Sequence, residues 1–172
     1  MNQPQNSELQ FKPLGSQLKG VGGWLLFFII GQLILRPART LSELNDPGNV
    51  VTPEFEAAFP TTATIISIER VFSIGLLAFG VAVALALWKI RTPFSVKLAK
   101  IYLIANPVIM LLDALVYKLS DLPPEIQDSI MSRGLMEAGV VAIVCLIWFL
   151  YFTKSERVRA TYYDDVTSLG LT

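Results

Sequence analysis

The chain has 172 residues, and its 14 Lys and Arg residues balance its 14 Asp and Glu residues, so the net charge is zero. Hydrophobic residues make up 53% and charged residues 16% of the chain, whereas a soluble domain carries about 25% charge. This composition argues against a soluble domain. The lack of net positive charge argues against nucleic-acid binding, and the lack of histidine removes the commonest metal ligand.

The first apolar run, Val21–Leu35, is predicted to be a retained membrane helix rather than a signal peptide. Arg36 and Arg39 stand where a signal peptidase needs small residues. The run is short for a hydrocarbon core of ~30 Å, so we expect the span to continue to about Arg39, with both arginines near the outer boundary. Pro37 allows the helix to end or kink just past Leu35.

Residues 40–61 are predicted to form a long outer loop, because they contain four acids and no base. Asp46–Asn49 reads Asp-Pro-Gly-Asn, which is a turn signal. Val50–Pro60 has no clear period, so we expect an irregular loop or a short surface helix there. The second span follows at about residues 62–88, around the apolar run Val71–Trp88.

The third and fourth spans are predicted at about residues 99–118 and 130–153. Asn106-Pro107 lies within the third span and should kink it. Between the two spans, Pro123-Pro124 is expected to start a short helix at best, with the fourth span beginning near Ser129. The sequence therefore predicts an all-α fold with four transmembrane helices in an up-down bundle.

The charges outside the spans alternate in sign. The N-terminal segment, residues 89–100 and the C-terminal flank are basic on balance, whereas residues 40–61 and 120–129 contain acids only. The positive-inside rule therefore places both termini in the cytoplasm. This gives a cytoplasmic N-terminal segment (residues 1–20), a four-span membrane domain (residues 21–153) and a cytoplasmic tail (residues 154–172).

Ionisable side chains inside a span need a reason, because each costs at least ~2.5–3.5 kcal/mol at the centre. The candidates all lie in the outer halves of spans or at their outer edges, and Lys118 lies at a boundary. They are Arg36, Arg39, Glu69, Arg70, Asp113, Arg133 and Glu137. In one interpretation they are interfacial anchors and pins between helices. In the other they line a polar cavity, open to the outside, that holds a ligand or passes a solute.

Two pairs are predicted within this set. Arg133 and Glu137 are four residues apart on one helix face and can pair. Asp113 is expected to pair with Arg70 across helices, because Glu69 and Arg70 are adjacent and point in different directions. Four arginines and one lysine stand against three acids. This excess of base would favour an anion, such as a lipid phosphate or a carboxylate.

Other residue types give no sign of chemistry. The single Cys145 lies inside the fourth apolar run and is interpreted as a small buried apolar side chain. Most tryptophans and tyrosines fall near span ends and are interpreted as interfacial belt residues: Trp24, Trp88, Trp148, Tyr102, Tyr117 and Tyr151. We find no catalytic constellation, no metal-ligand spacing and no cofactor motif. The sequence therefore predicts a protein that is not an enzyme.

Two stretches are similar to a known family. Gly20-Val21-Gly22-Gly23-Trp24-Leu25, with Gly31 and Pro37 downstream, resembles the opening of a family of small bacterial inner-membrane proteins, domain of unknown function 2569. Tyr151-Phe152-x-x-Ser155-x-Arg157-Val158-x-x-Thr161-Tyr162 resembles its closing motif. The likeness spans about residues 18–163. It implies a multi-pass protein of the bacterial cytoplasmic membrane, and it brings no established activity, cofactor or catalytic residue.

Two functions stay open. The first is a non-enzymatic binding or accessory protein that holds a lipid, a small anion or a partner complex through the outer polar residues. The second is a small oligomeric transporter or channel subunit in which the same residues line the path. Four spans are few for a monomeric transporter, which favours the first. The expected partners are membrane lipid and a possible second copy or larger membrane complex, without nucleic acid.

Overall fold

The computed structural model describes residues 20–44 and 51–163. Within these ranges the chain is helical and contains no strand. The predicted N-terminal segment, the predicted turn at Asp46–Asn49 and the last part of the predicted tail lie outside the described residues.

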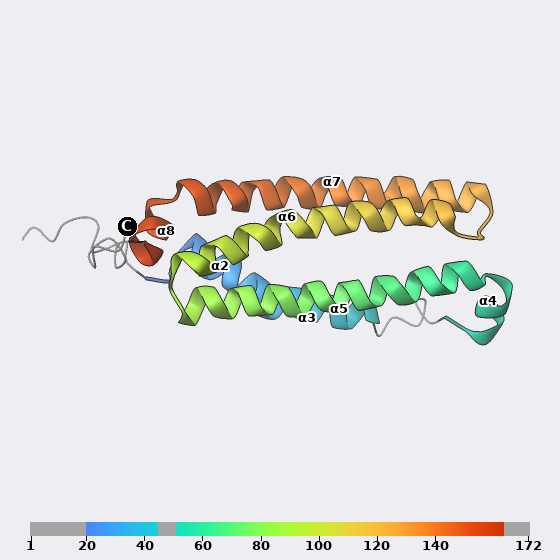
Figure 1. Ribbon diagram of the computed structural model, residues 1–172, viewed down its shortest axis with the longest axis horizontal. Helices are drawn as coiled ribbons and strands as arrows, with labels where there is room; N and C mark the ends of the chain where they lie inside the picture. The colour runs from blue at the N-terminus through green and yellow to red at the C-terminus, as the bar shows by residue number, and fades with distance from the viewer. Residues whose placement is uncertain (1–19, 45–50, 164–172) are drawn as a thin grey trace, which may run out of the picture.

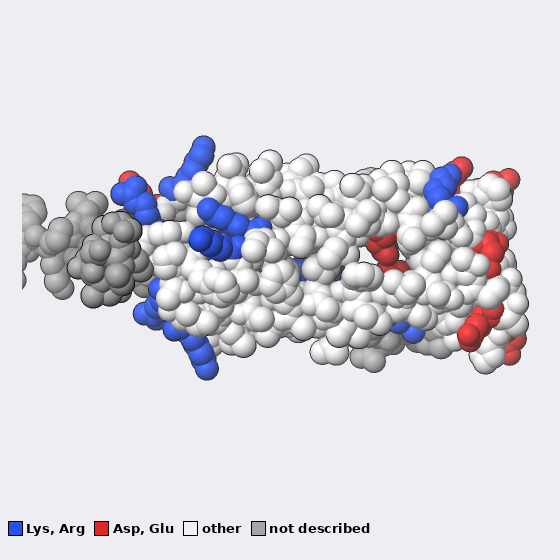
Figure 2. Space-filling model, in the orientation of Figure 1, with Lys and Arg blue, Asp and Glu red and all other residues white. Residues whose placement is uncertain are grey.

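Among the described residues, four helical stretches are long and apolar enough to cross a membrane, which confirms the predicted all-α, four-span fold. They are Trp24–Ser42, Pro60–Lys89, Pro93–Leu119 and Pro124–Lys154. They run up and down along one axis (Figure 1). Lysine and arginine gather at the end where the C-terminal helix lies, and acids gather at the opposite end (Figure 2). We call these the basic end and the acidic end; the charge rule predicts that the basic end faces the cytoplasm.

The first span is one continuous helical stretch with a widened turn in its middle. It comprises α2 (Trp24–Ile30), a π-helical segment η1 (Gly31–Leu35) and α3 (Arg36–Leu44). The Arg36 amide donates to the Gly31 carbonyl, five residues back, as a π-helix requires. Pro37 has no amide to donate, so the widened turn lies where the regular ladder would be broken. The helix therefore passes Pro37 and extends beyond the predicted boundary at Arg39.

The acidic end begins with the short helix α4 (Pro53–Ala58), where an irregular loop or short helix is expected. The Thr52 hydroxyl caps it by accepting from the Phe55 amide at 3.2 Å. The long helix α5 (Pro60–Lys89) follows. Asp121, from a distant turn, accepts hydrogen bonds from the first α5 amides, those of Thr61 and Thr62. A carboxylate at a helix N-terminus satisfies donors that have no partner within the helix.

The second hairpin consists of α6 (Pro93–Val116), η3 (Tyr117–Leu119) and α7 (Pro124–Lys154). Pro107 lies inside α6, which continues past it. The expectation of a short helix at Pro123-Pro124 is wrong, because α7 starts at Pro124 and runs unbroken to Lys154. Proline at the first helical position loses no hydrogen bond, since that amide has no partner within the helix.

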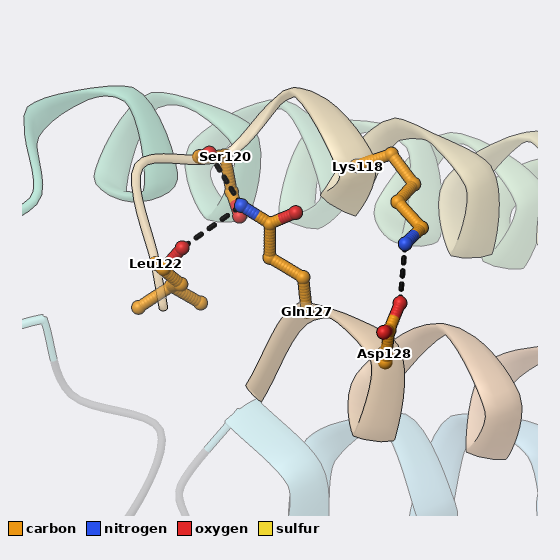
Figure 3. A network of polar contacts seen from close by, with 5 residues as sticks. All are labelled: Lys118, Ser120, Leu122, Gln127 and Asp128. Atoms are coloured by element: carbon orange, nitrogen blue, oxygen red, sulfur yellow. Dashed lines mark hydrogen bonds and ion pairs between the residues drawn. The ribbon is translucent and has the colours of Figure 1, made fainter. Parts of the chain in front are cut away.

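Side chains close the turn between these two helices (Figure 3). The Gln127 amide nitrogen donates to the Ser120 and Leu122 carbonyls at 2.9 and 2.8 Å. Lys118 pairs with Asp128 across the turn. The turn is therefore held by α7 itself, and α6 and α7 contact each other more extensively than any other two elements.

The basic end is closed by α8 (Glu156–Tyr162), which the Ser155 hydroxyl caps. Tyr162 is buried and donates to the Leu87 carbonyl at 2.7 Å, and burial raises the pKa of its hydroxyl. The Thr161 hydroxyl accepts from the Gly20 amide at 3.1 Å. The opening and closing motifs of the sequence thus meet at this end, which also holds most of the apolar core.

Candidate functional site

A polar network lies in the interior of the bundle, where the sequence predicts an apolar span. Arg36 on α3 donates to the Tyr102 hydroxyl and, at 2.9 Å, to the Asn106 side-chain oxygen, both on α6. The guanidinium carbon also lies 5.3 Å from the centroid of the Tyr102 ring, a cation–π distance. The network therefore places a charged group against buried polar and aromatic groups.

The other spans contribute to the same network. The Tyr102 hydroxyl donates to Gln32 Oε1 at 2.8 Å, and Asn106 Nδ2 lies 3.7 Å from the Cys145 sulfur on α7. Gly80 on α5 leaves the space for these side chains, since a Cβ there would lie 2.8 Å from Gln32 Oε1. All four spans thus meet at one point. The buried position of Cys145 agrees with its prediction, and its contact with Asn106 adds a polar neighbour.

This network lies near the middle of the bundle. Gly80 is nine residues before Lys89 and Cys145 is nine residues before Lys154, which is about 13.5 Å along a helix axis in each case. A hydrocarbon core of ~30 Å has its midplane at about the same depth. Arg36 therefore does not lie at the outer boundary, where the sequence places it. The first helix continues to Leu44, so the boundary falls further along the chain.

A second polar group lies between α5 and α6, towards the acidic end. The Tyr117 hydroxyl donates to Glu69 Oε2 at 2.8 Å. Asp113, one turn before Tyr117, is half-buried and close enough to Glu69 for a direct electrostatic interaction. Acidic atoms are visible in the largely uncharged middle part of the molecule, nearer the acidic end (Figure 2). The structure thus places two of the predicted acids within electrostatic range of each other, and a tyrosine donates a hydrogen bond to one of them.

One face of α6 connects the two groups. Tyr102, Asn106 and Asp113 on α6 and Tyr117, the first residue of η3, follow each other at intervals of four, seven and four residues. All four therefore lie on nearly the same face of this continuous helical stretch. We call these four residues the α6 polar stripe. It extends over about 22 Å and meets polar side chains of the first span and of α5. Interpreting Tyr102 as a belt residue is therefore wrong, since it is buried and its hydroxyl bonds inside the bundle. Tyr117 lies near the end of its span, and its interpretation as a belt residue stays a prediction.

The remaining predicted site residues lie apart from the stripe. Arg133 and Glu137 form the predicted pair, with Nε and Oε1 3.1 Å apart, but their side chains are 80% and 46% exposed. The pair therefore lies on the rim rather than in a cavity. Arg39 is exposed on α3, and Arg70 is half-buried on α5; both take part in interactions. The predicted pairing of Arg70 with Asp113 stays a prediction.

Sequence reasoning missed Gln32 and Asn106, which are uncharged polar residues inside apolar runs. It treats Asn106 only as the neighbour of a proline. A signal was present, because polar residues inside a span commonly bond between helices. The spacing of the α6 polar stripe is a second signal, since it repeats a helical face. Among the described residues, no group of three or more Cys, Asp or Glu side chains could hold a metal ion.

The family model for "Protein of unknown function (DUF2569)" matches residues 18–163. The chain belongs to the DUF2569 family. This confirms the resemblance of the opening and closing motifs, and the matched region contains both polar groups described above. No curated protein and no solved structure matches the chain. The family is one whose function is not known, and the four apolar helices indicate a multi-pass membrane protein, so the function must be argued from the residues.

Proposed function

We propose that this DUF2569 protein is a non-enzymatic binding protein of the bacterial cytoplasmic membrane. It holds a small polar ligand along the α6 polar stripe, and the ligand reaches the stripe from the acidic end. An intramembrane ionisable residue is costly and marks a functional site more often than an exposed one does. Here three such residues, Arg36, Glu69 and Asp113, contact or lie close to one polar face of one helix.

The observation that carries the proposal is that Glu69 and Asp113 lie within electrostatic range of each other, towards the acidic end of the bundle. Two carboxyl groups in a low-dielectric setting favour a cation or a shared proton. The sequence suggests an anion, because bases outnumber acids among the candidates. Arg36 is directed at Tyr102 and Asn106, and Arg133 pairs with Glu137 on the rim. The position of the carboxyl groups therefore favours a ligand with a cationic group, such as a protonated amine.

A second candidate function is transport, as a subunit of a small oligomer. It is favoured by the length of the stripe, since about 22 Å of polar face is a large part of a ~30 Å hydrocarbon core. Transport needs a continuous path, whereas binding needs only the outer part of the stripe. Flux of a bound compound into proteoliposomes would separate the two.

Native mass spectrometry from mild detergent tests the binding proposal. The wild-type protein should retain an adduct of defined mass that also reports the oligomeric state. Asp113→Asn keeps the shape of the side chain but removes its charge, so it should lose the adduct. Glu137→Gln is the matched control on the rim and should keep it. An adduct lost equally in both variants, or no adduct other than lipid in the wild type, would overturn the proposal.

A further inference from the structure

A pocket of ≈590 Å³ opens at the basic end, and no residue of the α6 polar stripe lines it. Its volume lies within the range of about 300–1,000 Å³ that is usual for ligand sites. It is lined by side chains of α6, of α7 and of the segment that continues into α8: Lys100, Phe152, Thr153, Ser155, Val158, Arg159 and Tyr163. None of these residues belongs to the candidate site described above.

The pocket combines two cations with an apolar floor. Lys100 comes from α6 and Arg159 from α8, so two separate elements place positive charge on one cavity. Lys100 Nζ also lies 5.7 Å from the centroid of the Phe149 ring, which holds the ammonium near α7. Phe152 and Val158 form the floor and are 2% and 1% exposed. Such a pocket suits a compact anion that is joined to an apolar body.

The walls are held in place by contacts on the far side of α8. Tyr162 donates to the Leu87 carbonyl on α5 at 2.7 Å, and the Thr161 hydroxyl bonds to the Gly20 amide at 3.1 Å. The Ser155 hydroxyl caps the start of the helix. The position of Arg159 relative to Lys100 is therefore set by packing, and the pocket is largely preorganised for a ligand.

An exposed apolar row begins at Lys100 and runs along α6 away from the basic end. At intervals of three or four residues it contains Ile104, Val108, Leu111 and Leu115, each more than 40% exposed. Residues at this spacing share one helix face. The phosphate of a phospholipid lies at the membrane surface and its acyl chains run towards the midplane. The arrangement of cations at the surface and apolar residues below them matches that of a lipid.

We propose that this pocket binds the phosphate group of an anionic phospholipid, through Lys100 and Arg159, with an acyl chain along the exposed row of α6. The proposal does not rest on the proposed function, because the two sites share no residue. The same phosphate chemistry is present in free inorganic phosphate. The position of the pocket at the end of an apolar helix face favours the lipid.

The test uses the full chain in mild detergent, titrated with phosphatidylglycerol or phosphatidylcholine and followed by native mass spectrometry. Phosphatidylglycerol should bind more tightly than phosphatidylcholine. The double variant Lys100→Gln with Arg159→Gln should weaken phosphatidylglycerol binding by about tenfold or more, because each charge-assisted hydrogen bond to a phosphate contributes about that much. Lys89→Gln with Lys97→Gln removes two exposed charges of the same end and should change binding less than about twofold.

One further double variant keeps the result interpretable. Lys100→Arg with Arg159→Lys retains both charges and should restore binding, which a folding defect would not allow. Equal losses in the pocket pair and the control pair would overturn the proposal, because attraction would then be general to the basic end. Equal affinity for the two lipids would also overturn it. Displacement of the lipid by millimolar inorganic phosphate, with phosphate alone protecting the protein against heat, would assign the site to free phosphate instead.

Discussion

Replacing Gly80 by alanine tests whether the interior network depends on close packing against α5. An added Cβ would lie 2.8 Å from Gln32 Oε1, 3.0 Å from Tyr102 Oη and 3.2 Å from Tyr102 Cε2. Tyr102 is only 1% exposed, so its ring has little room to move. Gln32 must therefore give way, and the hydrogen bond that it accepts from Tyr102 would lengthen or break.

The expected cost follows from these contacts. Overpacking a well-packed site costs about 1–3 kcal/mol, and hydrogen bonds between membrane helices contribute about 0.6 kcal/mol on average. Gly80→Ala should therefore lower the free energy of unfolding by about 1–3 kcal/mol. Gly75 is the matched control, because it lies on the same helix with no atom within 4 Å of its added Cβ. Gly75→Ala should be neutral or stabilising by up to ~1 kcal/mol, since alanine favours the helix.

Unfolding of the full chain in mixed micelles, with a rising fraction of SDS and circular dichroism as the readout, measures these differences. Gln32→Ala removes the closest atom, so Gly80→Ala should cost at least about 0.5 kcal/mol less in that background. If Gly80→Ala and Gly75→Ala have the same effect, or if Gly80→Ala costs the same with and without Gln32, the packing argument is wrong.

Other predictions address the acidic end. Gly134→Ala should lower the unfolding free energy by about 1–3 kcal/mol, because its Cβ would meet an alanine side chain of α6 at 2.8 Å. Gly139→Ala, whose Cβ would have nothing within 4 Å, should not lower it. The same unfolding assay compares the two variants. Glu137→Ala should cost only about 0.3–0.5 kcal/mol, as for an exposed pair on one helix, and a double-mutant cycle with Arg133→Ala checks this coupling. Burial alone would raise the pKa of Asp121, but the hydrogen bonds that its carboxylate accepts at the start of α5 lower it below the usual 3.8. A lowered pKa stabilises the folded state above the unfolded pKa, and this contribution is lost as the pH falls through the folded pKa. The protection factors of the first α5 amides, which divide out the intrinsic pH dependence of hydrogen exchange, should therefore fall below about pH 4, and Asp121→Asn should remove that fall.

The four spans could be predicted because their cause is local. Each apolar run is long enough for the membrane, and its flanking charges mark the ends. The exceptions involve proline. Pro123-Pro124 was expected to start a short helix at best, whereas Pro124 begins the long helix α7. Pro37 lies within a helix that widens beside it. Both outcomes depend on which backbone hydrogen bonds a proline removes at its position in the helix, and the presence of a proline in the sequence does not show that.

The candidate site could be predicted only in part, because its contacts join residues far apart in the sequence. The pair Arg133 and Glu137 was found from its spacing on one helix. Arg36 and Asn106 are seventy residues apart in the sequence, and nothing in either span specifies their pairing. The depth of Arg36 also depends on where the first helix ends. Charge alone placed it at a boundary, whereas the helix continues for eight further residues, to Leu44.

The interior polar residues have two roles to fill, and these differ in what they require. Inside a lipid bilayer apolar burial gives helices little reason to associate, so close packing and hydrogen bonds between helices must do so. An apolar stretch of 18 residues in each of the four spans is only 17–33% buried, so contacts such as those around Gly80 and Tyr102 contribute a large share of the helix association. A structural role depends on shape and hydrogen-bonding capacity, whereas a binding role at Asp113 depends on charge. Asp113→Asn preserves the shape and hydrogen-bonding capacity of the side chain and removes its charge. If this variant keeps its unfolding free energy but loses the adduct, Asp113 has a binding role. If the variant loses unfolding free energy but keeps the adduct, Asp113 has a structural role in the bundle.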